Sequence, residues 1–244
     1  MTNTVEFPVP PSGSAPGAAT GRGVLAPLST SASAPTSPST SGQGRKPAVV
    51  LLQEWWGVNS HIENLCTRMA AEGFVVLAPD LYHGAVARNA EDAGKLMNAL
   101  DWDLALREIA GAVEFLRNHE GTNGKVGVMG FCMGGALTFG AACRIKGLGA
   151  AVPFYGLPPS AYAQWSEVDA PILAHFAQQD DWAKASAAEE VRSILKAQGK
   201  AMDLHVYDAS HAFVNDTRPD VHHPQAAALA WQRTVAFFQK HLSV

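Results

Sequence analysis

The sequence predicts an α/β protein built on a mostly parallel sheet with helices on both faces. Short apolar runs of strand length alternate along the chain with longer segments whose apolar residues recur every three or four positions. Because the short runs are apolar throughout, both faces of the sheet are expected to be covered by helices. A third observation concerns chemistry: one apolar run ends in the pattern Gly-x-Cys-x-Gly at residues 130–134.

Composition limits the partners of the chain. Its 244 residues, 47% of them hydrophobic, suffice for one domain with a substantial core. A formal net charge of −4 argues against binding to nucleic acid or to an anionic membrane. The sequence shows no signal peptide and no apolar run of membrane-spanning length, and its three cysteines lack metal-site spacing. We therefore expect a cytoplasmic protein that is a monomer or a small homo-oligomer.

Residues 1–45 differ in composition from the rest, because they are rich in Ser, Pro, Gly, Ala and Thr. Residues 4–9 predict a short strand, and residues 17–25 its hairpin partner. Residues 29–44 are predicted to form a mobile loop, since low-complexity sequence buries little apolar surface. Residues 46–244 are expected to form the α/β domain.

The pattern of the α/β domain predicts its elements in order. Strands are expected at residues 48–52, 74–78, 126–131, 149–155, 172–176 and 204–207. Helices are expected at residues 60–73, 102–116, 136–143, 183–198 and 224–241. Ser60 is interpreted as the N-cap of the first helix, with Glu63 completing a capping box. Ile194 is expected on the same helical face as Val191 and Leu195, and the polar stretch through Asp92 is assigned no element.

The Gly-x-Cys-x-Gly pattern is typical of the nucleophile elbow of an α/β-hydrolase, with cysteine where serine is usual. The turn from strand to helix is sharp, so Gly130 and Gly134 are needed where a Cβ would collide with backbone. The Cys132 sulfur is expected near the positive end of the following helix, which favours the thiolate. The alternative is a glycine-rich packing turn with a buried structural cysteine.

Two further residues follow strands in the chain order of a hydrolase triad, which is nucleophile, acid, histidine. Asp180 follows the strand at 172–176, and His211 follows the strand at 204–207. The imidazole can take up and return protons, while the carboxylate fixes its tautomer and stabilises the imidazolium. Asp181 is the other candidate for the acid. Each residue also has a plainer interpretation, since aspartates often cap turns and loop histidines are usually solvated.

Glu54 lies at the end of the first central strand, next to the expected elbow. Its carboxylate could accept the Cys132 proton or hold the thiol in an unreactive pose; alternatively it is a charge paired with a buried arginine. The backbone N–H groups of Trp55 and Met133 are the natural oxyanion donors. Trp55 and Trp56 could line an apolar acyl pocket or serve only as core aromatics.

At these residues the sequence resembles the dienelactone hydrolase (carboxymethylenebutenolidase) family. The matching segments are Gln53-Glu54-x-x-Gly57-Val58-Asn59, Pro79-Asp80-Leu81-Tyr82, Gly124-Lys125-Val126-Gly127, Gly130-x-Cys132-x-Gly134-Gly135-Ala136-Leu137, Gln179-Asp180 and His211-x-Phe213. The resemblance implies an α/β-hydrolase fold and a triad of Cys132, Asp180 and His211. It also implies that Glu54 governs thiolate formation, and that no metal or organic cofactor is needed.

The chain departs from the family where the best-known members bind a substrate carboxylate. Their two arginines fall at Asn215 and Ala90 here, and a substrate-contacting tyrosine falls at Gly94. Arg88 and Arg218 are close enough in sequence to substitute. The residues that we expect to bind substrate are Trp56, Tyr82, Arg88, Phe213 and Asn215.

The sequence thus predicts a cysteine-dependent hydrolase of carboxylic esters or lactones that works through a Cys132 thioester and acts on a small molecule. Two alternatives stay open. One is a thioesterase or acyltransferase of the same fold that excludes water. The other is a non-catalytic hydrolase-fold protein that binds a ligand or senses redox state.

Overall fold

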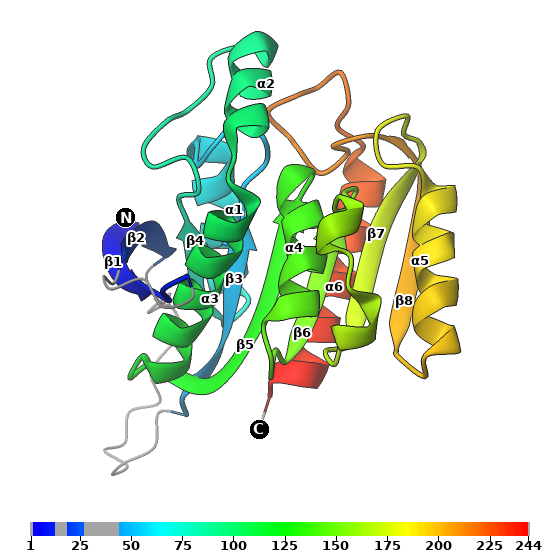
Figure 1. Cartoon of the computed structure of the whole chain (residues 1–244). Helices are drawn as coiled ribbons and strands as arrows, with labels where there is room; N and C mark the ends of the chain where they lie inside the picture. Colours follow the sequence, from blue (N-terminus) through cyan, green and yellow to red (C-terminus); the bar gives the residue numbers. More distant parts are fainter. Residues whose placement is uncertain (1, 13–18, 27–43, 244) are drawn as a thin grey trace, which may run out of the picture.

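The computed structural model describes residues 2–12, 19–26 and 44–243. Within these residues, eight strands form one sheet in the order β1-β2-β4-β3-β5-β6-β7-β8 (Figure 1). The six strands β3 to β8 run parallel to one another, whereas β1 and β2 are antiparallel to their neighbours. Their bounds are β1 Asn3–Val9, β2 Ala19–Ala26, β3 Lys46–Leu52, β4 Val75–Pro79, β5 Thr122–Phe131, β6 Ala150–Phe154, β7 Ile172–Gln179 and β8 Met202–Ser210.

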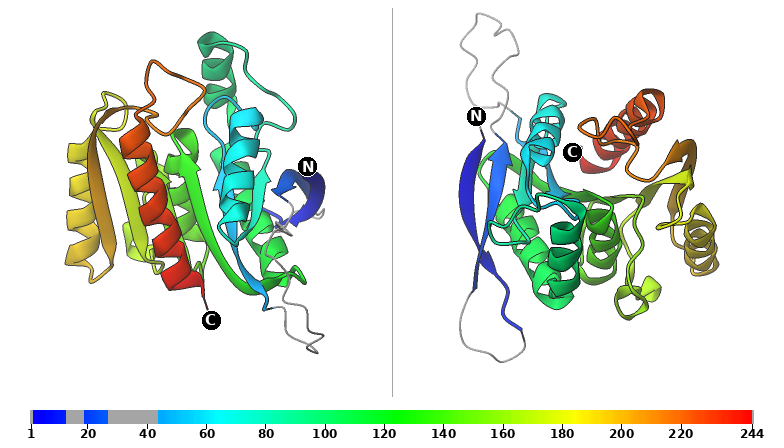
Figure 2. Two further views of the ribbon diagram at one scale, coloured as in Figure 1. Left: turned by 180° about the vertical axis from the view of Figure 1, so that it is seen from behind. Right: turned by 90° about the horizontal axis from the view of Figure 1, so that it is seen from above.

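Helices cover both faces of this sheet (Figure 2). Residues of α1 and α6 share one hydrophobic cluster, whereas α3, α4 and α5 pack on the opposite face. The short helix α2 projects beyond the carboxyl ends of the strands (Figure 1). The helices are α1 Ser60–Ala71, α2 Ala90–Ala99, α3 Trp102–Asn118, α4 Met133–Arg144, α5 Ala185–Ala197 and α6 Pro224–Leu242, with 3-10 turns at Ser160–Tyr162 and Trp165–Glu167.

Strand β3 shows why the apolar runs had to be continuous. Val49 and Leu51 pack in the cluster of α1 and α6, whereas Val50 and Leu52 pack in the cluster of α3. Because successive side chains of a strand point to opposite faces, a strand covered on both sides has no polar position. The predicted α/β architecture is confirmed.

The predicted N-terminal hairpin is also confirmed. Strands β1 and β2 pair antiparallel, and β2 joins the main sheet through β4. Phe7 of β1 is buried and packs against Phe115 of α3 at a ring separation of 6.3 Å. The predicted mobile loop at 29–44 lies, except for Gly44, outside the described residues.

The structure corrects three local predictions. The N-cap of α1 is Asn59 rather than Ser60, because the Asn59 side chain accepts a hydrogen bond from the Ile62 N–H. Helix α2 was not predicted, although Asn89 caps it through the Asp92 N–H. Ile194 of α5 is exposed, whereas Val191 and Leu195, which were expected on its face, are buried. No helix of the described residues has the length and apolar character to cross a membrane.

Candidate active site

Cys132 lies at the sharp turn between β5 and α4. Its backbone has φ 56° and ψ −114°, a left-handed φ that strains a residue with a side chain. The Cys132 N–H donates to the Phe154 carbonyl at 3.1 Å and fixes the turn against β6. A Cβ at Gly130 would collide with the Gly134 carbonyl, and one at Gly134 with the Gln53 carbonyl. The elbow therefore needs both glycines, and it leaves Cys132 partly exposed.

Asp180 and His211 meet at the ends of β7 and β8. The His211 Nδ1 lies 2.7 Å from Asp180 Oδ2. The other carboxylate oxygen, Oδ1, accepts the N–H groups of Trp182 at 2.8 Å and Ala183 at 2.9 Å. Both carboxylate oxygens of Asp180 thus have hydrogen-bond partners. Asp180 is also buried, whereas Asp181 is exposed. Of the two candidate acids, Asp180 is the one that contacts His211.

The charge state of His211 reflects both of its partners. Burial lowers its pKa, but the hydrogen bond that His211 donates to Asp180, the hydrogen bond and charge of Cys132 and the charge of Asp180 together raise it to about 10. An imidazolium held by the Asp180 carboxylate follows from this balance. The arrangement can supply a nucleophilic sulfur and a proton donor at the same carbonyl group.

Glu54 lies two residues beyond β3 and is buried. Its Oε2 accepts a hydrogen bond from Asn215 Nδ2 at 2.7 Å, so its partner is an amide and not the buried arginine that the sequence left open. Burial raises its pKa to about 7, although Asn215, His211, Arg218 and Tyr155 lower it in part. Glu54 therefore changes charge near neutral pH, in the pocket that Cys132 also lines.

Tyr155 is a site residue that the sequence analysis did not single out. It follows β6, is fully buried, and has a positive φ of 34°. Its ring meets that of His211 edge to face at 5.1 Å. Burial, with the charges of Glu54 and Cys132, raises the pKa of its hydroxyl well above the usual value. The sequence feature that could have identified Tyr155 is its position directly after a parallel strand, which it shares with Cys132 and His211.

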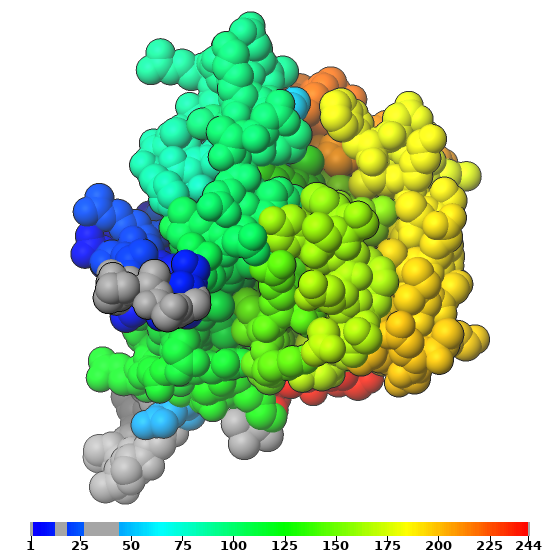
Figure 3. Space-filling view, viewed as in Figure 1, coloured from blue at the N-terminus to red at the C-terminus, as the bar shows by residue number. Residues whose placement is uncertain are grey.

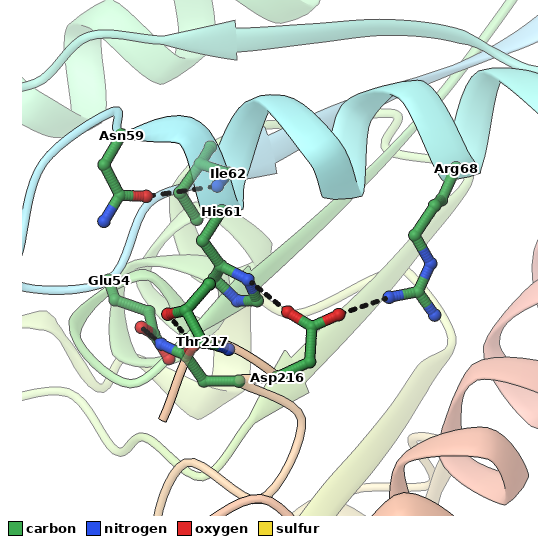
Figure 4. A network of polar contacts seen from close by, with 8 residues as sticks. Glu54, Asn59, His61, Ile62, Arg68, Asp216 and Thr217 are labelled. Carbon is green, nitrogen blue, oxygen red and sulfur yellow. Dashed lines mark hydrogen bonds and ion pairs between the residues drawn. The ribbon is translucent and has the colours of Figure 1, made fainter. Parts of the chain in front are cut away.

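The loop after β8 is held to α1 by a network of polar contacts (Figure 4). Asn215 Oδ1 accepts the Thr217 N–H at 3.1 Å and its hydroxyl at 2.6 Å, which turns the amide nitrogen toward Glu54. Asp216 lies 3.2 Å from His61 Nδ1 and 3.8 Å from an Arg68 nitrogen. These contacts position the segment that carries His211.

The two backbone N–H groups expected at the oxyanion hole are available. Trp55 follows β3, and Met133 is the first residue of α4. Over the described ranges, neither N–H donates a hydrogen bond to another group of the chain. N–H groups without an acceptor in the chain are what a developing oxyanion requires.

A pocket of about 290 Å³ opens at Cys132. It is lined by Glu54, Trp55, Trp56, Met97, Cys132, Trp182, His211, Ala212, Arg218 and Val221. A neighbouring cavity of about 320 Å³ is lined by Trp55, Trp56, Asn59, Ala90, Asn215, Thr217 and Arg218. A wider groove of about 700 Å³ beside the hairpin contains none of the predicted catalytic residues. Met97, Trp182 and Val221 were not predicted, because α2 and the rim loops have no motif.

The predicted substrate-binding residues divide into two groups. Trp56 lines the pocket, and Asn215 lines the neighbouring cavity. Tyr82, Arg88 and Phe213 line neither. The Tyr82 hydroxyl donates to the Met133 sulfur, and Phe213 is fully buried. Arg88 is exposed on the loop before α2.

Of the two arginines that could substitute for the family pair, Arg218 is the one at the pocket. It lines both cavities and pairs with Asp220 at 2.6 Å. Among the residues that the structure describes, no three His, Cys, Asp or Glu side chains are grouped so that they could hold a metal ion.

Comparison with known proteins agrees with this geometry. The model of the dienelactone hydrolase family matches residues 33–242. A protein of Aquifex pyrophilus named Protein usf is 38% identical over 208 residues, which are 81% of this chain and 89% of that protein. A protein of Aquifex aeolicus provisionally named carboxymethylenebutenolidase is 35% identical, over 80% of this chain and 89% of its own length.

A solved structure extends the likeness to the fold. The crystal structure of a provisionally named dienelactone hydrolase from Klebsiella pneumoniae superimposes with a TM-score of 0.79 at 25% identity. The match covers 98% of this chain and 99% of the other. The chain therefore belongs to the dienelactone hydrolase family of the α/β-hydrolase superfamily, and it is a hydrolase of small carboxylic esters or lactones.

Proposed function

We propose that the chain hydrolyses neutral esters and lactones through a covalent intermediate on Cys132. The Cys132 thiolate attacks the acyl carbon, and the carbonyl oxygen becomes an oxyanion that accepts hydrogen bonds from the N–H groups of Trp55 and Met133. The His211 imidazolium then donates its proton to the departing alkoxide. The C–O bond breaks and the acyl group remains as a thioester, while the alcohol of an ester leaves and that of a lactone stays attached to the acyl chain.

In deacylation His211 accepts a proton, whereas in acylation it donates one. Acylation removes the thiolate charge and its hydrogen bond, two of the causes that raise the pKa of His211. The imidazole of the acyl-enzyme is therefore neutral more readily and can take a proton from water, while Asp180 stabilises the imidazolium that forms. Hydroxide adds to the thioester, the C–S bond breaks, and the carboxylic acid departs from a restored thiolate–imidazolium pair.

Glu54 is proposed to control the thiol. With a pKa near 7 and a position beside the nucleophile, its carboxylate can accept the Cys132 proton as substrate enters. Once Glu54 is protonated, the pocket no longer contains an uncompensated negative charge from this side chain. The pocket then suits a neutral substrate, because Ala90 and Asn215 stand where the family's best-known members carry arginines, and Arg218 is paired with Asp220. The free thiols of Cys66, Cys132 and Cys143 agree with action in the cytoplasm.

The observation that carries this proposal is the Asp180–His211 hydrogen bond next to the elbow cysteine. The test is to mix the protein with 4-nitrophenyl acetate and record intact mass and peptide maps on a millisecond-to-second timescale. We expect a burst of nitrophenol, one acetyl group on Cys132 and no acetylation of Cys132→Ala. Undiminished hydrolysis by Cys132→Ala would overturn the mechanism. Acetyl transfer to an added alcohol in preference to water would reclassify the chain as an acyltransferase.

A further inference from the structure

The active-site pocket has a wall of three tryptophans whose indole rings the proposed chemistry does not use. Trp55 and Trp56 follow β3, and Trp182 follows β7. The rings of Trp55 and Trp56 lie 5.1 Å apart at an interplanar angle of 65°, and those of Trp55 and Trp182 lie 6.4 Å apart. All three line the pocket that contains Cys132.

Trp182 combines a fixed backbone with an open side chain. Its N–H donates to Asp180 Oδ1 at 2.8 Å, so the residue is tied to the carboxylate that holds His211. Trp182 is nevertheless 79% exposed, which is the highest exposed fraction among the large exposed hydrophobic residues that the structure describes. An indole held at the rim of a pocket with an uncovered face is a surface that gains by receiving another apolar ring.

The rest of the rim is apolar or neutralised. Met97 of α2, Ala212 and Val221 line the same pocket, and its arginine, Arg218, is engaged by Asp220. In the space-filling view, α2 and the yellow segment near residue 180 stand out as two projections, with the orange segment lying deeper between them (Figure 3). The pocket therefore offers a ring-shaped apolar group contacts from both Met97 and Trp182.

We infer that Trp182, together with Trp55, forms a subsite for an aryl group on the alcohol side of the ester, which makes phenyl and naphthyl esters the substrate class. The assignment to the alcohol side rests on the proposed function. The leaving oxygen must lie within hydrogen-bond reach of His211, which protonates it. Trp182 and His211 line the same pocket, so the group attached to that oxygen is within reach of this indole. Offset or edge contacts between rings add to the area that they bury.

The kinetic test compares 2-naphthyl acetate with ethyl acetate, which share one acyl group. In Trp182→Ala, kcat/KM for the naphthyl ester is expected to fall about tenfold more than for the ethyl ester, as the loss of a ring contact implies. Because each variant is compared with wild type on both esters, the intrinsic reactivity of the leaving groups cancels. Trp182→Phe should restore most of the preference. Ile194→Ala, which removes an exposed side chain of α5, should leave the ratio unchanged.

The binding test separates the subsite from the chemistry. Isothermal titration of 2-naphthol into Cys132→Ala should give a Kd that rises about tenfold when Trp182→Ala is added. If esters acylate Cys132 but the naphthyl preference is the same in Trp182→Ala, the aryl subsite is refuted and the proposed function stands. If 2-naphthol binds through Trp182 while no ester acylates the wild-type protein, the subsite stands and the proposed function fails.

Discussion

Asn215 donates a hydrogen bond of 2.7 Å to Glu54, and both residues are buried at the edge of the catalytic pocket. The partner of this carboxylate is thus a neutral amide, at a position where the family's best-known members carry an arginine. An amide compensates a buried charge only in part, so burial dominates and raises the pKa of Glu54 to about 7. The carboxylate is therefore poised to change charge near neutral pH, at a cost to stability.

The first prediction follows from that cost. Between pH 4.5 and pH 7 the folded protein binds more protons at Glu54 than the unfolded chain does, so its stability falls as pH rises through this window. Glu54→Gln removes the buried charge and keeps an acceptor for Asn215. At pH 8 the variant should be more stable than wild type by on the order of 3 kcal/mol, the equivalent of the raised pKa.

Thermal melts at half-unit steps from pH 4.5 to pH 8 test this expectation. The gap in Tm between Glu54→Gln and wild type should open with rising pH, whereas Glu120→Gln, at an exposed position, should show no such gap. In kcat/KM profiles, the acid limb near pH 7 should be missing from Glu54→Gln. A gap that stays constant with pH would mean that Glu54 does not titrate in this range.

The second prediction concerns substrate charge. Ala90 lines the cavity beside the catalytic pocket and is exposed, so Ala90→Arg can place a guanidinium there without repacking the core. We expect kcat/KM for a carboxylate-bearing lactone to rise about tenfold relative to a neutral lactone, because a charge-assisted hydrogen bond contributes about 1.5–3 kcal/mol. Steady-state kinetics with both lactones give the ratio.

Asn215→Arg is the less direct way to the same charge, since position 215 faces Glu54 and an arginine there would lower the Glu54 pKa. The matched control is Arg88→Ala, which should leave the ratio unchanged because Arg88 lines neither cavity. If wild type already prefers the carboxylate-bearing lactone and Arg218→Ala abolishes the preference, Arg218 performs the family role and the pocket is not neutral.

Local sequence patterns were sufficient for the fold and for bringing the proposed triad together. Cys132, Asp180 and His211 each follow an apolar run, and parallel strands in one sheet end at the same edge. Glycines at 130 and 134 marked the elbow, because backbone atoms approach them too closely for a Cβ. These features depend on residues close in sequence, and the match to the family confirms the family assignment.

Contacts between distant loops were not predictable in the same way. Glu54 and Asn215 are 161 positions apart, and no periodicity links them. Trp182 reaches the rim because its N–H bonds to Asp180, which depends on the direction of one side chain. Helix α2 has a start signal in Asn89 and two acidic residues in its first turn, but it buries little apolar surface, because Ala93 is its one buried residue.

The third prediction distinguishes the two neighbouring aspartates. Asp180→Asn should lower kcat by several orders of magnitude, because an amide in contact with His211 Nδ1 no longer fixes the imidazole tautomer or stabilises its charge. Asp181→Asn, at an exposed position, should lower it less than threefold. Steady-state rates, with circular dichroism as a check on folding, decide the point. The reverse pattern would show that the acid has been assigned one residue too early.

The fourth prediction concerns thiol reactivity. Burial raises the pKa of the Cys66 thiol to about 12 and that of Cys143 to about 11, so both remain protonated at neutral pH. Iodoacetamide should therefore modify Cys132 first, and the loss of esterase activity should parallel that modification. Peptide mapping over time provides the measurement, with Cys66→Ala as a control that should lose activity at the same rate. Alkylation of Cys143 ahead of Cys132 would contradict the assignment of the nucleophile.

The last prediction concerns Asp216, which connects the loop after β8, the segment that carries His211, to α1. Its carboxylate contacts the Nδ1 of His61, which is 2% exposed, so Asp216→Ala leaves a buried ring nitrogen without its partner. Such a loss costs about 1–3 kcal/mol in the free energy of unfolding. Asp216→Asn keeps an acceptor for His61 and gives up only the longer contact with Arg68 at 3.8 Å, so most of the stability should be retained.

Two measurements separate these effects. Urea unfolding should rank wild type and Asp216→Asn together, above Asp216→Ala. Hydrogen exchange should be faster across residues 211–223 in Asp216→Ala, because the neighbouring Asn215–Glu54 contact loses the support of α1, and kcat/KM should fall with it. Asp220→Ala, at the exposed ion pair with Arg218, serves as the control and should leave exchange in residues 211–217 unchanged. Equal destabilisation by Asp216→Asn and Asp216→Ala would mean that the charge on Asp216, and not its hydrogen bond with His61, stabilises the contact between this loop and α1.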